Sequence, residues 1–150
     1  MIKLTRTNSE NSDFINLIRE LDENLLEING EEQSFFTQFN KIDMIKHVII
    51  AYNNNVPVGC GAIKEYSSDT VEVKRMFVTK NNRGQGIASQ ILTGLCSWAK
   101  ESGYKKCILE TGIRQLEAVT LYKKNNFSVT PNYGQYKYIK NSVCFEKILK

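Results

Sequence analysis

Several features that would commit a chain to a membrane, a redox framework or a metal are missing from this sequence. No apolar run approaches the roughly 20 residues that cross a bilayer as a helix, and the opening MIKLTRTNSE lacks the apolar stretch of a signal peptide. The four cysteines, Cys60, Cys96, Cys107 and Cys144, form no CxxC pair, and His47 is the only histidine. We therefore expect a cytoplasmic protein with reduced thiols and no metal, and we assign His47 no role.

The chain also has only a small excess of positive over negative charge. The formal net charge is +4, with the lysines scattered along the chain. This balance is compatible with anionic ligands but is too weak to indicate nucleic acid. The 150 residues, 41% hydrophobic and 24% charged, suit one compact domain over residues 1–150. No repeat or linker divides the chain, and neither nucleic acid nor a membrane is an expected partner.

Hydrophobic periodicity predicts both helices and strands. Strands are expected at 2–6, 46–54, 58–66, 70–78, 106–111, 127–130 and 141–149, and helices at 9–28, 31–42, 86–101 and 114–126. Within 70–78, strand alternation places Val71, Val73 and Phe77 on one face and Glu72, Lys74 and Met76 on the other. This order of elements predicts an α+β fold around a mixed sheet.

The segment NNRGQGIASQIL, residues 81–92, places Arg83, Gly84 and Gly86 where a strand gives way to an amphipathic helix. Glycine is costly to order, so two within three positions indicate a positive-φ turn or a ligand close to the backbone. Free backbone N–H groups and the positive end of the helix dipole favour an anion there, and Arg83 adds a cation. The spacing is neither a P-loop nor a dinucleotide fingerprint. A tight turn without a ligand is the alternative for this segment alone.

With its surroundings, the segment resembles the acetyl-CoA-binding motif of the GNAT N-acetyltransferases, Q/R-x-x-G-x-G/A, here Arg83 to Ala88. Downstream, CILETGIRQLEAVTLYKKNNF resembles the next block of that family, a strand followed by a helix with A-x-x-L-Y-x-x-x-x-F. The hairpin VPVGCGAIKEY and the strand VEVKRMFV match the preceding part, so the resemblance covers roughly residues 45–150. Two positions depart from the family pattern. Lys80 stands where proline is frequent, and Asn126 stands where glycine is usual, although asparagine tolerates positive φ.

The resemblance implies a GNAT-type sheet: mixed, mostly antiparallel, with a central splayed pair of parallel strands and helices on both faces. It implies acetyl-CoA as co-substrate between the strands that end near Val78 and Glu110, with its pyrophosphate on the amides of residues 83–88. The residues expected to bind it are Met76, Phe77, Val78, Arg83, Gly84, Gln85, Gly86, Ile87, Ala88, Gln115 and Tyr122.

The same resemblance implies catalytic roles. Tyr122 matches the family tyrosine that reaches the CoA sulfur, and a phenol with a pKa near 10 is protonated at neutral pH and can donate to a thiolate. Glu110 matches the glutamate that protein N-terminal acetyltransferases of the family use as base. Glu72, on the neighbouring strand, is the competing base, and deprotonation through water is a third route. The structural alternatives are a core aromatic for Tyr122 and ion-paired carboxylates for the two glutamates.

The activity implied is direct transfer of an acetyl group from acetyl-CoA to a primary amine of a small molecule in a ternary complex. Acetylation of a protein N-terminus or lysine is one alternative, and a CoA-binding sensor without turnover is another. Candidates for the acceptor side are Lys74, Arg75, Tyr133, Tyr136 and Tyr138, where a cation would suit an acceptor that carries a carboxylate. If the chain oligomerises, we expect a homodimer.

Overall fold

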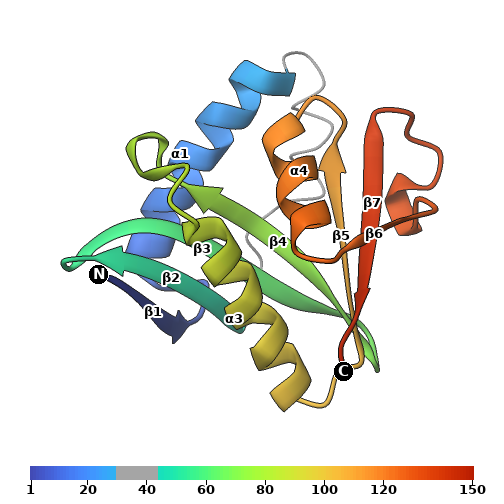
Figure 1. The fold of residues 1–150 in the computed structure, drawn as a ribbon, viewed down its shortest axis with the longest axis horizontal. Coiled ribbons are helices and arrows are strands. Elements are labelled where there is room, and N and C mark those ends of the chain that lie inside the picture. The colour runs from blue at the N-terminus through green and yellow to red at the C-terminus, as the bar shows by residue number, and fades with distance from the viewer. Residues whose placement is uncertain (30–43) are drawn as a thin grey trace.

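The structure is a computed structural model that describes residues 1–29 and 44–150. Within these residues a seven-stranded sheet has the order β1-β2-β3-β4-β5-β7-β6 (Figure 1). Its strands are β1 (Ile2–Thr7), β2 (His47–Asn53), β3 (Val56–Ser67), β4 (Thr70–Val78), β5 (Lys106–Gly112), β6 (Ser128–Thr130) and β7 (Ser142–Ile148). The helices are α1 (Ser12–Asn29), α3 (Ile87–Glu101) and α4 (Leu116–Lys124), with short 3-10 helices η2 (Lys80–Asn82) and η3 (Gly134–Tyr136). The helix expected at 31–42 falls outside the described residues.

The sheet is covered by helices on both faces, as its apolar pattern requires. Val48 and Ile50 of β2 pack with α1, whereas Ile49 and Ala51, which alternate with them, pack with α3. The apolar stripe of α3 and part of α4 share one core cluster, and α1 covers the opposite face (Figure 1). None of the helices in the described ranges is long and apolar enough to span a membrane.

The first helix begins where the sequence supplies a cap. Asn11 Oδ1 accepts hydrogen bonds from the backbone N–H groups of Asp13 at 2.8 Å and Phe14 at 3.3 Å. This satisfies two donors that have no partner within the helix. From there Phe14, Leu17, Ile18, Leu21 and Leu25 form the buried stripe that the periodicity predicts. The cap and the stripe together fix which face of α1 lies on the sheet.

Strand β4 contains a β-bulge. Cys60 pairs with Phe77 and Ala62 pairs with Lys74, so Arg75 and Met76 together lie opposite a single residue of β3. Arg75 has a φ of 60°, a conformation that a non-glycine residue seldom adopts. The extra residue reverses the alternation of side chains beyond it.

The bulge overturns one expectation about this strand. Val71 and Val73 pack in the α3 cluster, but Phe77 packs in the α1 cluster. Met76 lies against the α3 cluster, on the opposite face from the one predicted. The prediction that Val71, Val73 and Phe77 share a face is wrong, because strict alternation does not allow for an inserted residue.

The parallel strands β4 and β5 pair only at their first residues. Their partners are Thr70 with Lys106, Val71 with Cys107 and Glu72 with Ile108. Beyond these pairs β4 continues along β3 to its end, and β5 continues along β7 to its end. The sheet therefore opens between the carboxyl halves of β4 and β5 (Figure 1). This confirms the central splayed pair and the α+β fold class expected from the sequence.

The turn after α4 also follows expectation. Asn126, which replaces a glycine of the family pattern, has a φ of 69°. Asparagine adopts this left-handed conformation more readily than most residues, so the turn forms without glycine. All four cysteines are buried and none forms a disulfide.

Candidate active site

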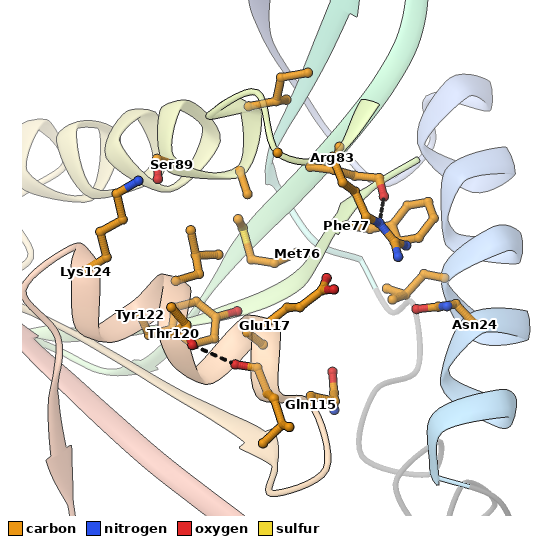
Figure 2. A pocket seen from close by; sticks show the side chains of 18 of the residues that line it. Asn24, Met76, Phe77, Arg83, Ser89, Gln115, Glu117, Thr120, Tyr122 and Lys124 are labelled. Atoms are coloured by element: carbon orange, nitrogen blue, oxygen red, sulfur yellow. Dashed lines mark hydrogen bonds between the residues drawn. The ribbon is translucent and has the colours of Figure 1, made fainter. Parts of the chain in front are cut away.

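A cavity of about 710 Å³ lies where β4 and β5 part. Its walls are the end of β4, the segment 82–89, α4 with the residues just before it, and one face of α1 (Figure 2). Of the residues expected to bind acetyl-CoA, those that line it are Met76, Phe77, Val78, Arg83, Gly84, Gly86, Ile87, Ala88, Gln115 and Tyr122. Gln85 is exposed and is not part of this wall.

The turn before α3 presents unbonded backbone donors to the cavity. Gly84 and Gly86 have φ values of 78° and 79°, and a Cβ added to either would meet no atom within 4 Å. Gly86 is the N-cap of α3, no side chain caps that end, and the Gln90 N–H bonds back to the Gly86 carbonyl at 3.1 Å. The N–H groups of the first helical turn thus lack a partner within the helix. Open space, free donors and the helix dipole make this end suitable for a phosphate.

Cations surround this end of the cavity. Arg83 Nε donates to the Val78 carbonyl at 2.9 Å, and the guanidinium lies 5.6 Å from the centre of the Phe77 ring, which holds it at the end of β4 (Figure 2). Lys124 extends from α4 toward Ser89 at the start of α3 (Figure 2). Sequence reasoning did not single out Lys124, although its position two residues after Tyr122 places it on the same helix.

A second pocket of about 70 Å³ adjoins the first on the α1 side of the sheet. The two share Leu21, Met76, Gln115 and Tyr122. The smaller pocket is also lined by Leu25, Glu72, Val73, Lys74, Arg75, Glu110, Thr111, Gly112 and Tyr136. Tyr122 therefore lies at the junction of a large cavity and a small polar pocket.

Glu110 projects from the carboxyl half of β5 into the small pocket. Its Oε2 accepts a hydrogen bond from Ser142 Oγ at 2.6 Å. Burial raises the pKa of Glu110 to about 7 and the charge of Glu72 adds to this, while the Ser142 hydrogen bond and Lys74 act in the opposite direction. A carboxyl with a pKa near neutral is suited to accept a proton at physiological pH.

Glu72, the competing base, has both oxygens occupied. Oε2 accepts a hydrogen bond from the Tyr133 hydroxyl at 2.5 Å, and Oε1 lies 3.2 Å from Lys74 Nζ. The residue is 7% exposed. Tyr133 in turn packs edge-on against Tyr136 with ring centres 5.7 Å apart. Glu72 thus ties the loop around η3 to β4, which favours a structural and electrostatic role over that of a base.

Tyr122 is buried among aromatic rings. It is 6% exposed, and its ring centre lies 5.9 Å from that of Phe127 and 5.8 Å from that of Phe145. Burial, and then the charge of Glu110, raise the pKa of the phenol above its ordinary value. The hydroxyl points into the large cavity (Figure 2) and is protonated at neutral pH. A protonated hydroxyl that faces the cavity is able to donate a proton there.

One candidate for the acceptor side lies away from both pockets. Tyr138 is 87% exposed and lines neither of them. His47, to which no role was assigned, packs edge-on against Trp98 outside both. Ser142 was missed, because its contact with Glu110 follows from the register of β5 and β7, where it pairs with Gly112. In the described ranges, no three His, Cys, Asp or Glu side chains gather as metal ligands would. The expectation that the protein uses no metal ion stays a prediction.

Comparison with known proteins places the chain in a family. A family model described as "Acetyltransferase (GNAT) domain" matches residues 45–129. The IAA acetyltransferase of Azospirillum brasilense is 32% identical over 139 residues, which cover 90% of each chain. The uncharacterised N-acetyltransferase YsnE of Bacillus subtilis is 32% identical over 101 residues, or 66% of this chain and 67% of that one. This chain belongs to the GNAT acetyltransferase family.

Solved structures agree with this assignment. One from Klebsiella pneumoniae, assigned as an acyl-CoA N-acyltransferase, has a TM-score of 0.82 and 26% identity and covers 100% of this chain and 99% of that one. The PaiA N-acetyltransferase of Thermoplasma acidophilum, solved with coenzyme A, shares the fold at a TM-score of 0.74 and 17% identity, with 99% of both chains covered. The chain is therefore an acyl-CoA-dependent N-acetyltransferase with acetyl-CoA as co-substrate.

A carboxylate placed at the turn before α3 should block acetyl-CoA. Gly86→Glu puts a negative charge where the unbonded amides face the cavity, and like charges brought together cost several kcal/mol. We expect calorimetry to show at least about 100-fold weaker binding of acetyl-CoA. Gly103→Glu is the matched control, since Gly103 lies just after the same helix with a φ of 93° and open space at its Cβ. Equal affinities in the two variants would show that the turn does not hold the phosphates.

The raised pKa of Glu110 has a consequence for stability. The folded state favours the protonated carboxyl, so its contribution to stability is fully present below the unfolded-state pKa and is lost as pH rises through about 7. Glu110→Gln removes this loss and still offers Ser142 an acceptor. We expect Glu110→Gln to melt roughly 2 °C or more above wild type at pH 8, and close to wild type at pH 4.

The control for this measurement is Glu146→Gln on β7, where the carboxyl is 37% exposed and lies 3.8 Å from Lys106. It should give no gain at pH 8, because solvent already stabilises that charge. A Glu110→Gln melting difference that is the same at both pH values would contradict the assignment.

Proposed function

We propose that this chain transfers the acetyl group of acetyl-CoA directly to the primary amine of a small molecule within a ternary complex. The observation that carries the proposal is the meeting of two cavities at Tyr122, with Glu110 in the second. The cavity of about 710 Å³ suits an extended co-substrate, and the pocket of about 70 Å³ suits the amine end of a small acceptor. Contact between the two ligands at the junction allows transfer without a covalent intermediate on the protein.

The proposed binding site for acetyl-CoA follows the walls of the large cavity. The amides of residues 83–88 and the dipole of α3 hold the pyrophosphate, while Arg83 and Lys124 add positive charge. The backbone of residues 76–78 does not pair with β5, and its groups on that side, the Val78 carbonyl excepted, can bond the pantetheine arm as an added strand. Gln115, at the N-cap of α4, contributes its amide. Bound there, acetyl-CoA supplies the activated thioester.

Glu110 is the proposed base. It accepts a proton from the acceptor ammonium, and the free amine then attacks the thioester carbon. Among the described residues only its Oε2 is hydrogen-bonded, whereas both oxygens of Glu72 have partners. A pKa of about 7 leaves Glu110 about half ionised at neutral pH, and it holds the proton once taken.

Tyr122 is the proposed acid. It donates its phenol proton to the departing CoA thiolate, for which its raised pKa keeps it in the protonated form. A backbone N–H of residues 76–78 polarises the thioester carbonyl as negative charge develops on the oxygen. Glu110 and Tyr122 approach from opposite sides of the sheet. Both can reach one reacting centre because β4 and β5 part there.

Acetylation of a protein N-terminus or lysine is less well supported, because the pocket that contains Glu110 is small and lies under the η3 loop and α1. A sensor without turnover would have no use for a carboxyl of near-neutral pKa beside a buried phenol. A homodimer, if the chain oligomerises, and a single domain spanning residues 1–150 stay predictions. Turnover with a panel of amines and peptides separates these functions.

Removing the phenol hydroxyl should slow turnover without weakening acetyl-CoA binding. Tyr122→Phe loses one proton donor and little volume, so its packing against Phe127 and Phe145 is kept. We expect kcat to fall about 100-fold or more, the usual share of general acid catalysis. Steady-state kinetics with calorimetric binding as the companion measurement check this. Wild-type turnover in the variant would mean that Tyr122 only packs.

Removing the base should change the shape of the pH profile. Glu110→Gln should lower kcat/KM most at low pH, where little free amine is present, and the variant should partly recover at high pH. Tyr122→Phe should not recover in this way, because its defect is in protonating the leaving group. Profiles of kcat/KM from pH 6 to pH 10 check both. A Glu110→Gln profile parallel to wild type would move the base to Glu72 or to water.

A further inference from the structure

The β4 bulge places a buried arginine in the acceptor pocket. Lys74 and Arg75 are consecutive, and both line the pocket that holds Glu110, because the inserted residue interrupts strand alternation. The Arg75 side chain is only 4% exposed, and its backbone adopts a φ of 60°. Burial of a charged guanidinium and a positive-φ backbone both cost free energy of folding. Their occurrence together at the proposed active site suggests that Arg75 has a function there.

The intramolecular partner of Arg75 accounts for only part of its donor capacity. A guanidinium has five N–H donors. Among the described residues its side chain has one hydrogen-bond acceptor, Asp22 of α1, at 3.0 Å from Nη1. The guanidinium can therefore make further hydrogen bonds besides this one, and Arg75 lines the pocket that holds Glu110. Asp22 is itself 44% exposed, and solvent weakens its hold on the arginine charge.

The cations of the pocket each have a carboxylate partner. Among its described walls, Lys74 and Arg75 are cationic, while Glu72 and Glu110 are the carboxylates. Lys74 lies 3.2 Å from Glu72, and Arg75 lies 3.0 Å from Asp22. A carboxylate on the acceptor would share Arg75 with Asp22, because one guanidinium can bind two carboxylates through different N–H groups.

We propose that the acceptor carries a carboxylate close to its primary amine, as an α-amino acid does, and that Arg75 binds this carboxylate while the amine faces Glu110. This inference rests on the proposed function. Arg75 and Glu110 line one pocket of about 70 Å³, so the two groups of the acceptor are separated by few bonds. Leu21, Leu25 and Met76 are among the apolar residues of the same wall and favour an acceptor with an apolar side chain.

Paired acceptors test the carboxylate directly. Leucine with leucinamide, methionine with methioninamide and phenylalanine with phenylalaninamide differ only in that group. The amides have the more acidic ammonium and offer more free amine at pH 7.5, so without recognition of the carboxylate they would be the better acceptors. We expect kcat/KM to be at least about tenfold higher for the acid of at least one pair. Amides that equal or exceed their acids in every pair would overturn the inference.

The arginine is tested by Arg75→Gln. We expect KM for the preferred amino acid to rise about 10- to 100-fold, with kcat and the KM for acetyl-CoA little changed. The preference for acid over amide should disappear. Arg6→Gln is the control, since Arg6 is an ion-paired arginine on the surface at Glu101. An acid preference that survives in Arg75→Gln would contradict the assignment.

A second variant distinguishes binding of the acceptor carboxylate by Arg75 from a purely structural role. It changes Asp22, the α1 partner of Arg75, instead of the arginine itself. Asp22→Asn leaves the guanidinium in place and should keep the preference for the acid. Equal loss of that preference in Asp22→Asn and Arg75→Gln would mean that Arg75 acts only by tethering α1, against the inference.

The inference and the proposed function fail in different ways. Efficient acetylation of amines without a carboxylate, unaffected by Arg75→Gln, would leave the proposed function standing and remove only the inference. Acetyl-CoA binding without acetylation of any amine in a broad panel would remove both.

Discussion

The site depends on one constraint, the loss of pairing between β4 and β5 after Glu72 and Ile108. Each strand keeps its other neighbour, so the sheet opens at its centre without unravelling at its edges. The opening leaves the last residues of β4 without a neighbouring strand on one side, and it joins the α4 side of the sheet to the α1 side. Tyr122 and Glu110 start on different sides and meet only because the sheet is open between them.

Burial at this junction shifts the pKa of both groups and bears on the roles proposed for them. The same removal of solvent raises the pKa of both Glu110 and Tyr122, since it disfavours each anion. For the carboxyl this brings the pKa to about 7, where it can take a proton and hold it. The phenol, whose ordinary pKa is 10.0, is protonated at neutral pH with or without this rise. The Ser142 hydrogen bond and the charge of Lys74 oppose the rise of the Glu110 pKa.

Much of this arrangement was predictable from local sequence. The strands, the described helices and the glycine turn follow from short-range signals, and the turn faces the cavity as expected apart from Gln85. The bulge at Arg75 was not predictable, because no residue type in TVEVKRMFV marks where the register of two strands will shift. The faces predicted for Phe77 and Met76 were wrong for the same reason. The Ser142–Glu110 and Tyr133–Glu72 contacts were also out of reach, since they join strands and loops whose register only the fold sets.

The proposed mechanism requires that burial where the strands part gives the Glu110 carboxyl a near-neutral pKa. The most direct test is a titration of its side-chain carboxyl carbon by ¹³C NMR in the free protein, with the signal assigned by its absence in Glu110→Gln. The account predicts a midpoint at about pH 7. A midpoint near the ordinary value of 4.5 would show that the carboxyl is well solvated and would contradict the account.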